Sequence, residues 1–197
     1  MNSVIQEKIE QIHTLWDELA DFEAAATDAA LEHLMSALCG LVDAQNVGWL
    51  GAVRLDNPLA EDPVQGWRVR HVRFLHDCFA LPSDEAIREQ IRNLEQGSNV
   101  DISSIRNVML AGTFRVNRLC DIVSPTWFDS PYYHRYYLGS GRSDAIWAIL
   151  PVNRDAESYL GIYRGGLCPA RVKVVSPPGH AQPRPADRLL PAFPPRT

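Results

Sequence analysis

Apolar residues recur at a helical spacing near the start of the chain. Ile5, Ile9, Ile12, Trp16 and Leu19 are separated by four, three, four and three positions, the 3.5-residue average of a coiled-coil seam. This pattern predicts a helix over residues 3–24. Such a helix either pairs with the same helix of a second copy or packs as an amphipathic helix on its own domain, and the sequence leaves both interpretations open.

A second helix follows, for which Thr27 or Asp28 can provide the N-cap. Its apolar residues fall on one stripe, which we expect to be core. The stripe consists of Leu31, Leu34, Met35, Leu38 and Leu41.

Patterns typical of strands predict two hairpins. Residues 46–55 and 67–75 are rich in β-formers and flank a loop with two prolines, which indicates an antiparallel pair. Gly48 and Gly51 leave room there for a neighbouring backbone or a ligand. Residues 145–152 are apolar at both parities, as in a central strand, and residues 158–164 complete a second hairpin. Residues 103–123 are ambiguous, and within them residues 112–119 are compatible with a further strand.

Helices are expected between the hairpins. Ser83 can cap a helix whose buried side carries Ile87, Ile91 and Leu94 and which Gly97 ends. Ser-Pro pairs at 124–125 and 130–131 predict two short helices in succession. The order of elements gives an α+β fold, an antiparallel sheet with helices packed on it. We divide the chain into an N-terminal helix (1–26), a domain (27–165) and an irregular tail (166–197) that holds eight of the 14 prolines.

All six tyrosines lie between residues 132 and 163, beside several other aromatic residues. They either form core or line a pocket in which a hydroxyl and an apolar ring orient a small organic ligand. Because Tyr132, Tyr133, Tyr136 and Tyr137 cover more than one helix face, we expect that not all are core. The candidate ligand-binding residues are Trp49, Phe114, Arg115, Trp127, Tyr132, Tyr136 and Trp147.

Charge and motifs exclude several classes of function. The net charge is −5, and residues 1–44 carry nine acids against one base, so nothing attracts nucleic acid or an anionic membrane. The four cysteines are far apart, without the close pairs of zinc sites. No nucleophile elbow, phosphate loop or paired carboxylates occur. We expect no enzyme, catalytic residue, metal or cofactor, and, without a leader or apolar span, a cytoplasmic protein.

Several segments together resemble the sensory half of LuxR-type transcriptional regulators, whose N-terminal half is a GAF-like domain. They are GWLGAVRL (48–55), TFRVNRLCDIV (113–123), WFDSPYYHRYY (127–137), IWAILPVN (146–153) and SYLGIYR (158–164). The resemblance covers residues 28–164. It implies a small-molecule-sensing domain that forms a homodimer, with Ile5, Ile9, Ile12, Trp16 and Leu19 as its seam. The alternative is an interaction module without a ligand that pairs with full-length regulators.

The chain departs from this family in two respects. Past Arg164 the proline-rich residues contain no helix-turn-helix pattern, so we expect no direct nucleic-acid binding and interpret the chain as a truncated relative. A change of reading frame near Gly165 is our hypothesis for this break. In addition, the Trp-x-x-x-Tyr pair with which related receptors read homoserine lactones is absent, since Val53 follows Trp49 and His71 follows Trp67 at that spacing. This argues against a homoserine lactone held in that way.

Overall fold

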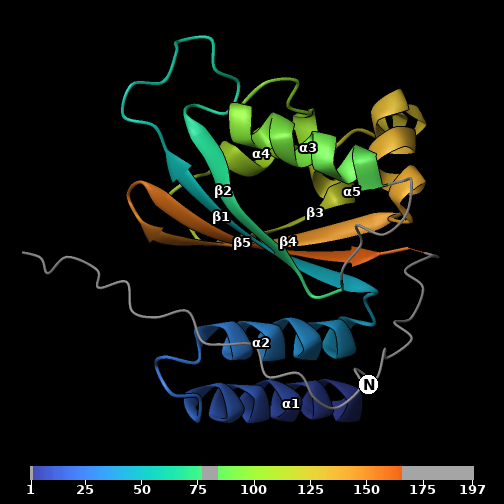
Figure 1. Cartoon of the computed structure of the whole chain (residues 1–197). Helices are drawn as coiled ribbons and strands as arrows, with labels where there is room; N and C mark the ends of the chain where they lie inside the picture. Colours follow the sequence, from blue (N-terminus) through green and yellow to red (C-terminus); the bar gives the residue numbers. More distant parts are fainter. Residues whose placement is uncertain (1, 77–83, 166–197) are drawn as a thin grey trace, which may run out of the picture.

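Helices cover both faces of one antiparallel sheet in the computed structural model, which describes residues 2–76 and 84–165 (Figure 1). The strands are β1 (Asn46–Arg54), β2 (Trp67–Phe74), β3 (Arg115–Arg118), β4 (Asp144–Asn153) and β5 (Ala156–Arg164). They are hydrogen-bonded in the order β2-β1-β5-β4-β3. The α+β class and both hairpins are therefore confirmed. The predicted tail lies outside the described residues.

The helices form an outer layer on each side of the sheet (Figure 1). Below the sheet lie α2 (Thr27–Val42) and, outermost, α1 (Asn2–Ala20). Above it lie α3 (Asp84–Gln96), α4 (Ile102–Val108) and α5 (Leu119–Ile122). Three shorter turns complete this upper layer: η1 (Pro125–Asp129), η2 (Tyr133–Tyr137) and η3 (Leu138–Ser140).

The lower core lies between α2 and the middle of the sheet. Met35 of α2 is fully buried against Val47 of β1 and Leu160 of β5. Most of the predicted stripe packs here, as expected, while Leu41 faces α1. The predicted cap is wrong, because Ala26 is the N-cap and no side chain caps this helix. Asp28 instead pairs with Arg73 at 3.0 Å.

The first helix packs on α2 and at the same time leaves its apolar seam in contact with solvent. Leu15 is buried, whereas Ile5, Ile9, Ile12 and Trp16 are exposed. The helix ends at Ala20, four residues before the predicted end. Packing of α1 on its own domain was one of the two interpretations that the sequence left open. It explains why Leu15 is buried, but it does not account for the exposed residues of the seam.

The two glycines expected to leave space in β1 are covered by rings of the chain itself. Gly48 faces Gly161 across the β1–β5 pair. A Cβ on Gly48 would lie 2.7 Å from the ring of Phe74, and the ring of Trp49 covers Gly51. These gaps therefore admit aromatic packing and leave no room for a ligand.

The tyrosine helix has π-type geometry. Leu138 N–H donates to the carbonyl of Tyr133, a hydrogen bond from residue i+5 to residue i that widens the turn. As a result Tyr133, Tyr136 and Tyr137 are buried together and Tyr132 is half-buried. The half-buried Tyr132 agrees with the expectation that not all four tyrosines are core, and the wider turn explains why the other three are buried together.

Candidate functional site

A partly open cavity lies between the upper face of the sheet and helices α3 and α4. It encloses about 80 Å³. Its walls are mainly apolar, with a few polar side chains from α4 and the strands. The lining residues are Leu50, Ala52, Val64, Trp67, Arg68, Val69, Leu94, Ser104, Asn107, Val108, Trp147 and Tyr159.

Strand alternation explains which residues reach the cavity. Successive side chains of a strand point to opposite faces of the sheet, so Leu50 and Ala52 face upward while Trp49 faces α2. Ala52 pairs with Val69, and Trp147 lies on β4 two strands away. The small side chain of Ala52 between larger neighbours is one reason why space remains here.

A buried ion pair closes one side of the cavity. Arg68 Nη2 donates to Asp62 Oδ2 at 2.7 Å, and the two side chains are almost fully buried. Burial alone would raise the pKa of Asp62, but the hydrogen bonds from Arg68 and from the backbone N–H groups of Val64 and Gly66 lower it. The arginine also lies tightly over the turn that ends α3. A Cβ on Gly97, whose φ is +71°, would lie 2.3 Å from Arg68 Cζ.

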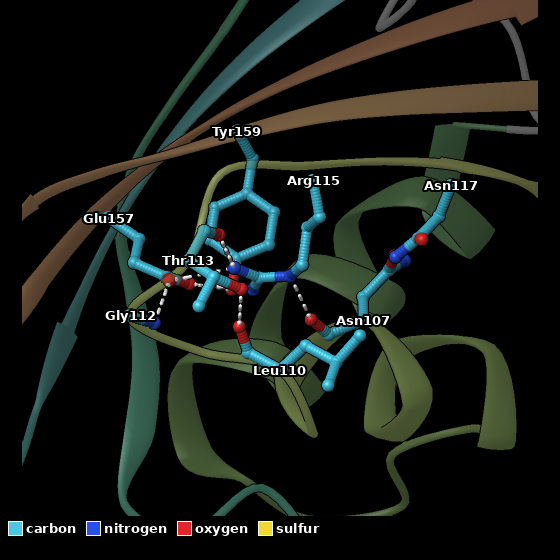
Figure 2. Close-up of polar contacts among 8 residues, drawn as sticks. All are labelled: Asn107, Leu110, Gly112, Thr113, Arg115, Asn117, Glu157 and Tyr159. Atoms are coloured by element: carbon cyan, nitrogen blue, oxygen red, sulfur yellow. Dashed lines mark hydrogen bonds and ion pairs between the residues drawn. The ribbon is translucent and has the colours of Figure 1, made fainter.

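A second buried ion pair supports the opposite wall (Figure 2). Arg115 of β3 donates to both carboxylate oxygens of Glu157, each at 2.8 Å. Tyr159 Oη donates to Glu157 Oε2 at 2.6 Å, and the N–H of Gly112 donates to Oε1 at 2.8 Å. Arg115 Nε donates to the carbonyl of Asn107 at 2.9 Å. Strands β3 and β5 and the end of α4 are thereby joined at one point.

The pKa values in this cluster follow from burial and charge. Burial would raise the pKa of Glu157, but the hydrogen bonds from Arg115, Tyr159 and Gly112 outweigh it and lower the pKa. Burial, reinforced by the adjacent Glu157 carboxylate, raises the pKa of Tyr159. Glu157 is therefore a carboxylate and Tyr159 a neutral phenol at neutral pH. Because Tyr159 and Asn107 also line the cavity, the cluster fixes the position of that wall.

A separate aromatic cluster lies in the upper layer, outside the cavity. Trp127 contacts Phe128, Tyr132, Tyr133 and Tyr137, with ring centroids 5.3–6.1 Å apart. Gln90 of α3 donates to Tyr132 Oη at 2.8 Å, and Trp127 Nε1 donates to Asp101 Oδ2 at 3.1 Å. Burial raises the pKa of Tyr132 and Tyr137, so both hydroxyls are neutral. This cluster fills the core between the η turns, α3 and α4.

The seven residues predicted to bind a ligand do not converge on one place. Trp147 lines the cavity, and Arg115 lies directly behind its wall. Trp127, Tyr132 and Tyr136 belong to the aromatic cluster. Trp49 lies on the lower face of the sheet, stacked on His71, and Phe114 is 65% exposed.

Most residues of the cavity wall could not be predicted from the sequence. Trp67 and Tyr159 were placed on strands, but nothing indicated that their faces meet. The one usable signal was alternation, since residues of β5 at the parity of Tyr159 and Tyr163 share a face. The contribution of Asn107 could not be found, because α4 was not predicted.

Neither a metal site nor a membrane span is found in the part of the chain that the structure describes. Over residues 2–76 and 84–165, His, Cys, Asp and Glu side chains form no group of three that could hold a metal ion. Within the same ranges, each helix is too short or too polar to cross a bilayer.

Comparisons with known proteins give a likeness of fold to solved structures. No protein-family model matches the chain, and no curated protein matches it. Among solved structures, the chain is similar to the LBD domain of VqsR from Pseudomonas aeruginosa, at 15% identity and a TM-score of 0.47, with 80% of each chain covered. At this identity and TM-score the likeness carries no argument about function.

Proposed function

We propose that the chain is a small-molecule-sensing domain related to the GAF-like sensory half of LuxR-type regulators. The observation that supports this most is the partly open cavity between the sheet and helices α3 and α4. Its apolar walls with a few polar groups, among them Asn107 and Tyr159, are typical of sites that hold and orient a small organic molecule. The sequence resemblance supports the same class of function.

The size of the cavity restricts the ligand. Pockets for drug-sized molecules enclose roughly 300–1,000 Å³, and an engineered cavity of about 150 Å³ binds benzene. A cavity of about 80 Å³ takes a group of only a few carbon atoms. A larger ligand therefore either extends out of the open side of the cavity or requires α3 or α4 to move away from the sheet. Such a movement would alter the contact between Arg68 and Gly97 and so could report occupancy.

Native mass spectrometry of the freshly purified chain tests the proposal. We expect a reproducible additional mass, and a mass of a few hundred daltons would mean that the ligand extends beyond the cavity or has opened it. Ala52→Leu, which fills the cavity from β1, should remove the additional mass, whereas Ala60→Leu at an exposed loop position should not. Retention of the adduct in Ala52→Leu, with the fold intact by circular dichroism, would place the ligand elsewhere.

Xenon provides a second test that needs no knowledge of the ligand. Dry apolar cavities bind xenon, so xenon pressure should shift the NMR signals of Ala52 and Val69. The shifts should disappear in Ala52→Leu and persist in Ala60→Leu. Unchanged spectra of the wild-type protein would show that no accessible cavity exists in solution.

A second candidate function is a dimerising interaction module without a ligand. The exposed apolar seam of α1 favours it. The two candidates differ in their response to Tyr132→Phe and Tyr136→Phe. In a sensor these changes weaken ligand binding because they alter the packing of α3 beside the cavity, whereas an interaction module is unaffected. Dimerisation through α1 is compatible with both.

A further inference from the structure

Helix α1 presents an apolar face to solvent along almost its whole length. The exposed residues of this face are Ile5, Ile9, Ile12 and Trp16, each 40% or more exposed and Trp16 67% exposed. Isolated exposed apolar residues are normal, but a contiguous stripe on one helix is typical of an interaction surface. The stripe amounts to on the order of 500 Å² per copy.

An apolar groove runs beside this stripe, between α1 and α2. It encloses about 600 Å³. Its walls include Ile12, Trp16 and Leu19 of α1 and Leu34, Leu38 and Leu41 of α2. Lys8 contributes the one charge in its lining, and its Nζ donates to the carbonyl of Leu41 at 2.8 Å. The groove is suited to apolar side chains.

We infer that a second copy of this chain occupies the groove, so that α1 and α2 of both copies form an antiparallel four-helix layer. This rests on the dimerising part of the proposed function and goes beyond a two-helix seam. The two-fold axis passes near Ile12. Trp16 of each copy then packs against Ile9 and Ile5 of the other copy, and these two isoleucines cover the groove beside that Trp16.

The distribution of charge on α1 favours a second copy as the occupant. On a helical wheel Glu7, Glu10, Asp17 and Glu18 all lie a third of a turn or more from the centre of the seam. The side of the seam away from α2 carries Gln6 and His13. Two identical faces can therefore meet without carboxylates opposing each other, as an isologous interface requires.

The extent of the stripe excludes a ligand confined to the groove. Ile5 and Ile9 do not line the groove and would stay exposed if a small molecule filled it. A second α1 helix covers them as well. The pair would bury on the order of 1,000 Å², the lower end for a specific interface, so a dissociation constant on the order of micromolar is expected.

Two arguments favour the antiparallel orientation. The macrodipoles of adjacent antiparallel helices attract, whereas those of parallel helices repel. In addition, an antiparallel pair places the large Trp16 ring opposite the smaller Ile5 and Ile9. A parallel pair would instead place two Trp16 rings opposite each other.

Sedimentation equilibrium over a concentration series tests the dimer. The 22.1 kDa chain should approach twice that mass at high concentration. Trp16→Ala should weaken association at least about 30-fold, as expected of a tryptophan anchor. Leu59→Ala, which changes a loop residue that is 82% exposed, should have no effect. A wild-type chain that stays monomeric at about 100 times the expected micromolar constant, or an unchanged Trp16→Ala variant, would overturn the inference.

A charge-pair experiment tests the orientation. Ile9→Glu and Trp16→Lys should each abolish self-association. An equimolar mixture of the two variants should associate again. In an antiparallel pair the new glutamate at position 9 of one variant meets the new lysine at position 16 of the other. The second contact of that pair joins the unchanged Trp16 and Ile9. Failure of the mixture to associate would exclude this orientation. The xenon experiment can also be carried out on the monomeric Trp16→Ala variant. It therefore tests the sensing proposal independently of the dimer.

Discussion

Removing the charge of Glu157 should strongly destabilise the fold. The Glu157 and Arg115 side chains are 0% and 5% exposed, and their bidentate contact joins β5 to β3. The substitution Glu157→Gln leaves the Arg115 guanidinium buried without a counter-charge. Breaking a buried ion pair in this way costs about 3–5 kcal/mol, a large part of a typical 5–15 kcal/mol total. We expect about 3 kcal/mol, because glutamine retains one acceptor oxygen.

Urea denaturation followed by tryptophan fluorescence measures this loss. The midpoint should fall with the slope unchanged, and the thermal midpoint should fall by about 10 °C. Glu61→Gln, at an exposed position, is the matched control and should change stability by less than about 0.5 kcal/mol. The double variant Arg115→Met/Glu157→Leu should be less destabilised than the sum of its single variants, since it leaves no unpaired charge.

The same pair predicts a dependence on pH. The pKa of Glu157 is lower in the folded chain than its ordinary value of 4.5. Its stabilising contribution is therefore complete above that value and is lost as the pH falls through the folded pKa. The difference between wild type and Glu157→Gln should be full at neutral pH and shrink in acid. A difference below about 1 kcal/mol at neutral pH would refute the assignment of this pair as a structural anchor.

Two further predictions concern positions outside the ion pair. Gly97→Ala should lower the free energy of unfolding by about 1–2 kcal/mol, because φ is +71° and the new Cβ meets Arg68. Gly40→Ala should instead raise it by about 0.5–1 kcal/mol, because Gly40 lies within α2 and its Cβ would point into open space. Urea titration compares the two, and equal effects would contradict the close approach of Arg68. Met35→Ala should cost about 2–5 kcal/mol and the exposed Met109→Ala less than about 0.5 kcal/mol, measured by thermal unfolding. Similar losses would mean that α2 is not packed on the sheet.

Local patterns were sufficient for most of the secondary structure. The strands of both hairpins and the C-terminal end of α3 follow from alternation, turn residues and Gly97. The predicted cap Ser83 lies outside the described residues. Helices α4 and α5 were missed because each is short, with seven and four residues, too few for a periodic pattern. Asp101 does cap α4 by accepting from the N–H of Ser103 at 2.8 Å, a signal that the sequence contained.

The candidate site was much harder to predict. A cavity forms where residues from distant segments face one another, and no local pattern records that meeting. Trp49 and Leu50 are adjacent in sequence, yet only Leu50 lines the cavity. In the sequence Arg115 has the features of a ligand-binding residue. In the structure its guanidinium is paired with the carboxylate of Glu157, 42 positions away, and is not available to a ligand.

The sequence by itself determined the α+β class, the two hairpins and the amphipathic helices, because periods of 2 and 3.6 residues reflect which side chains avoid water. Only the tertiary structure decided which sheet face holds the cavity, how the tyrosines pack and that the α1 seam stays exposed. These depend on pairings between remote segments, such as β1 with β5, and on the π-turn at Tyr133–Tyr137. The physical reason is that the burial of a side chain and the neutralisation of its charge depend on the residues that contact it in the folded chain, and these are often remote in sequence.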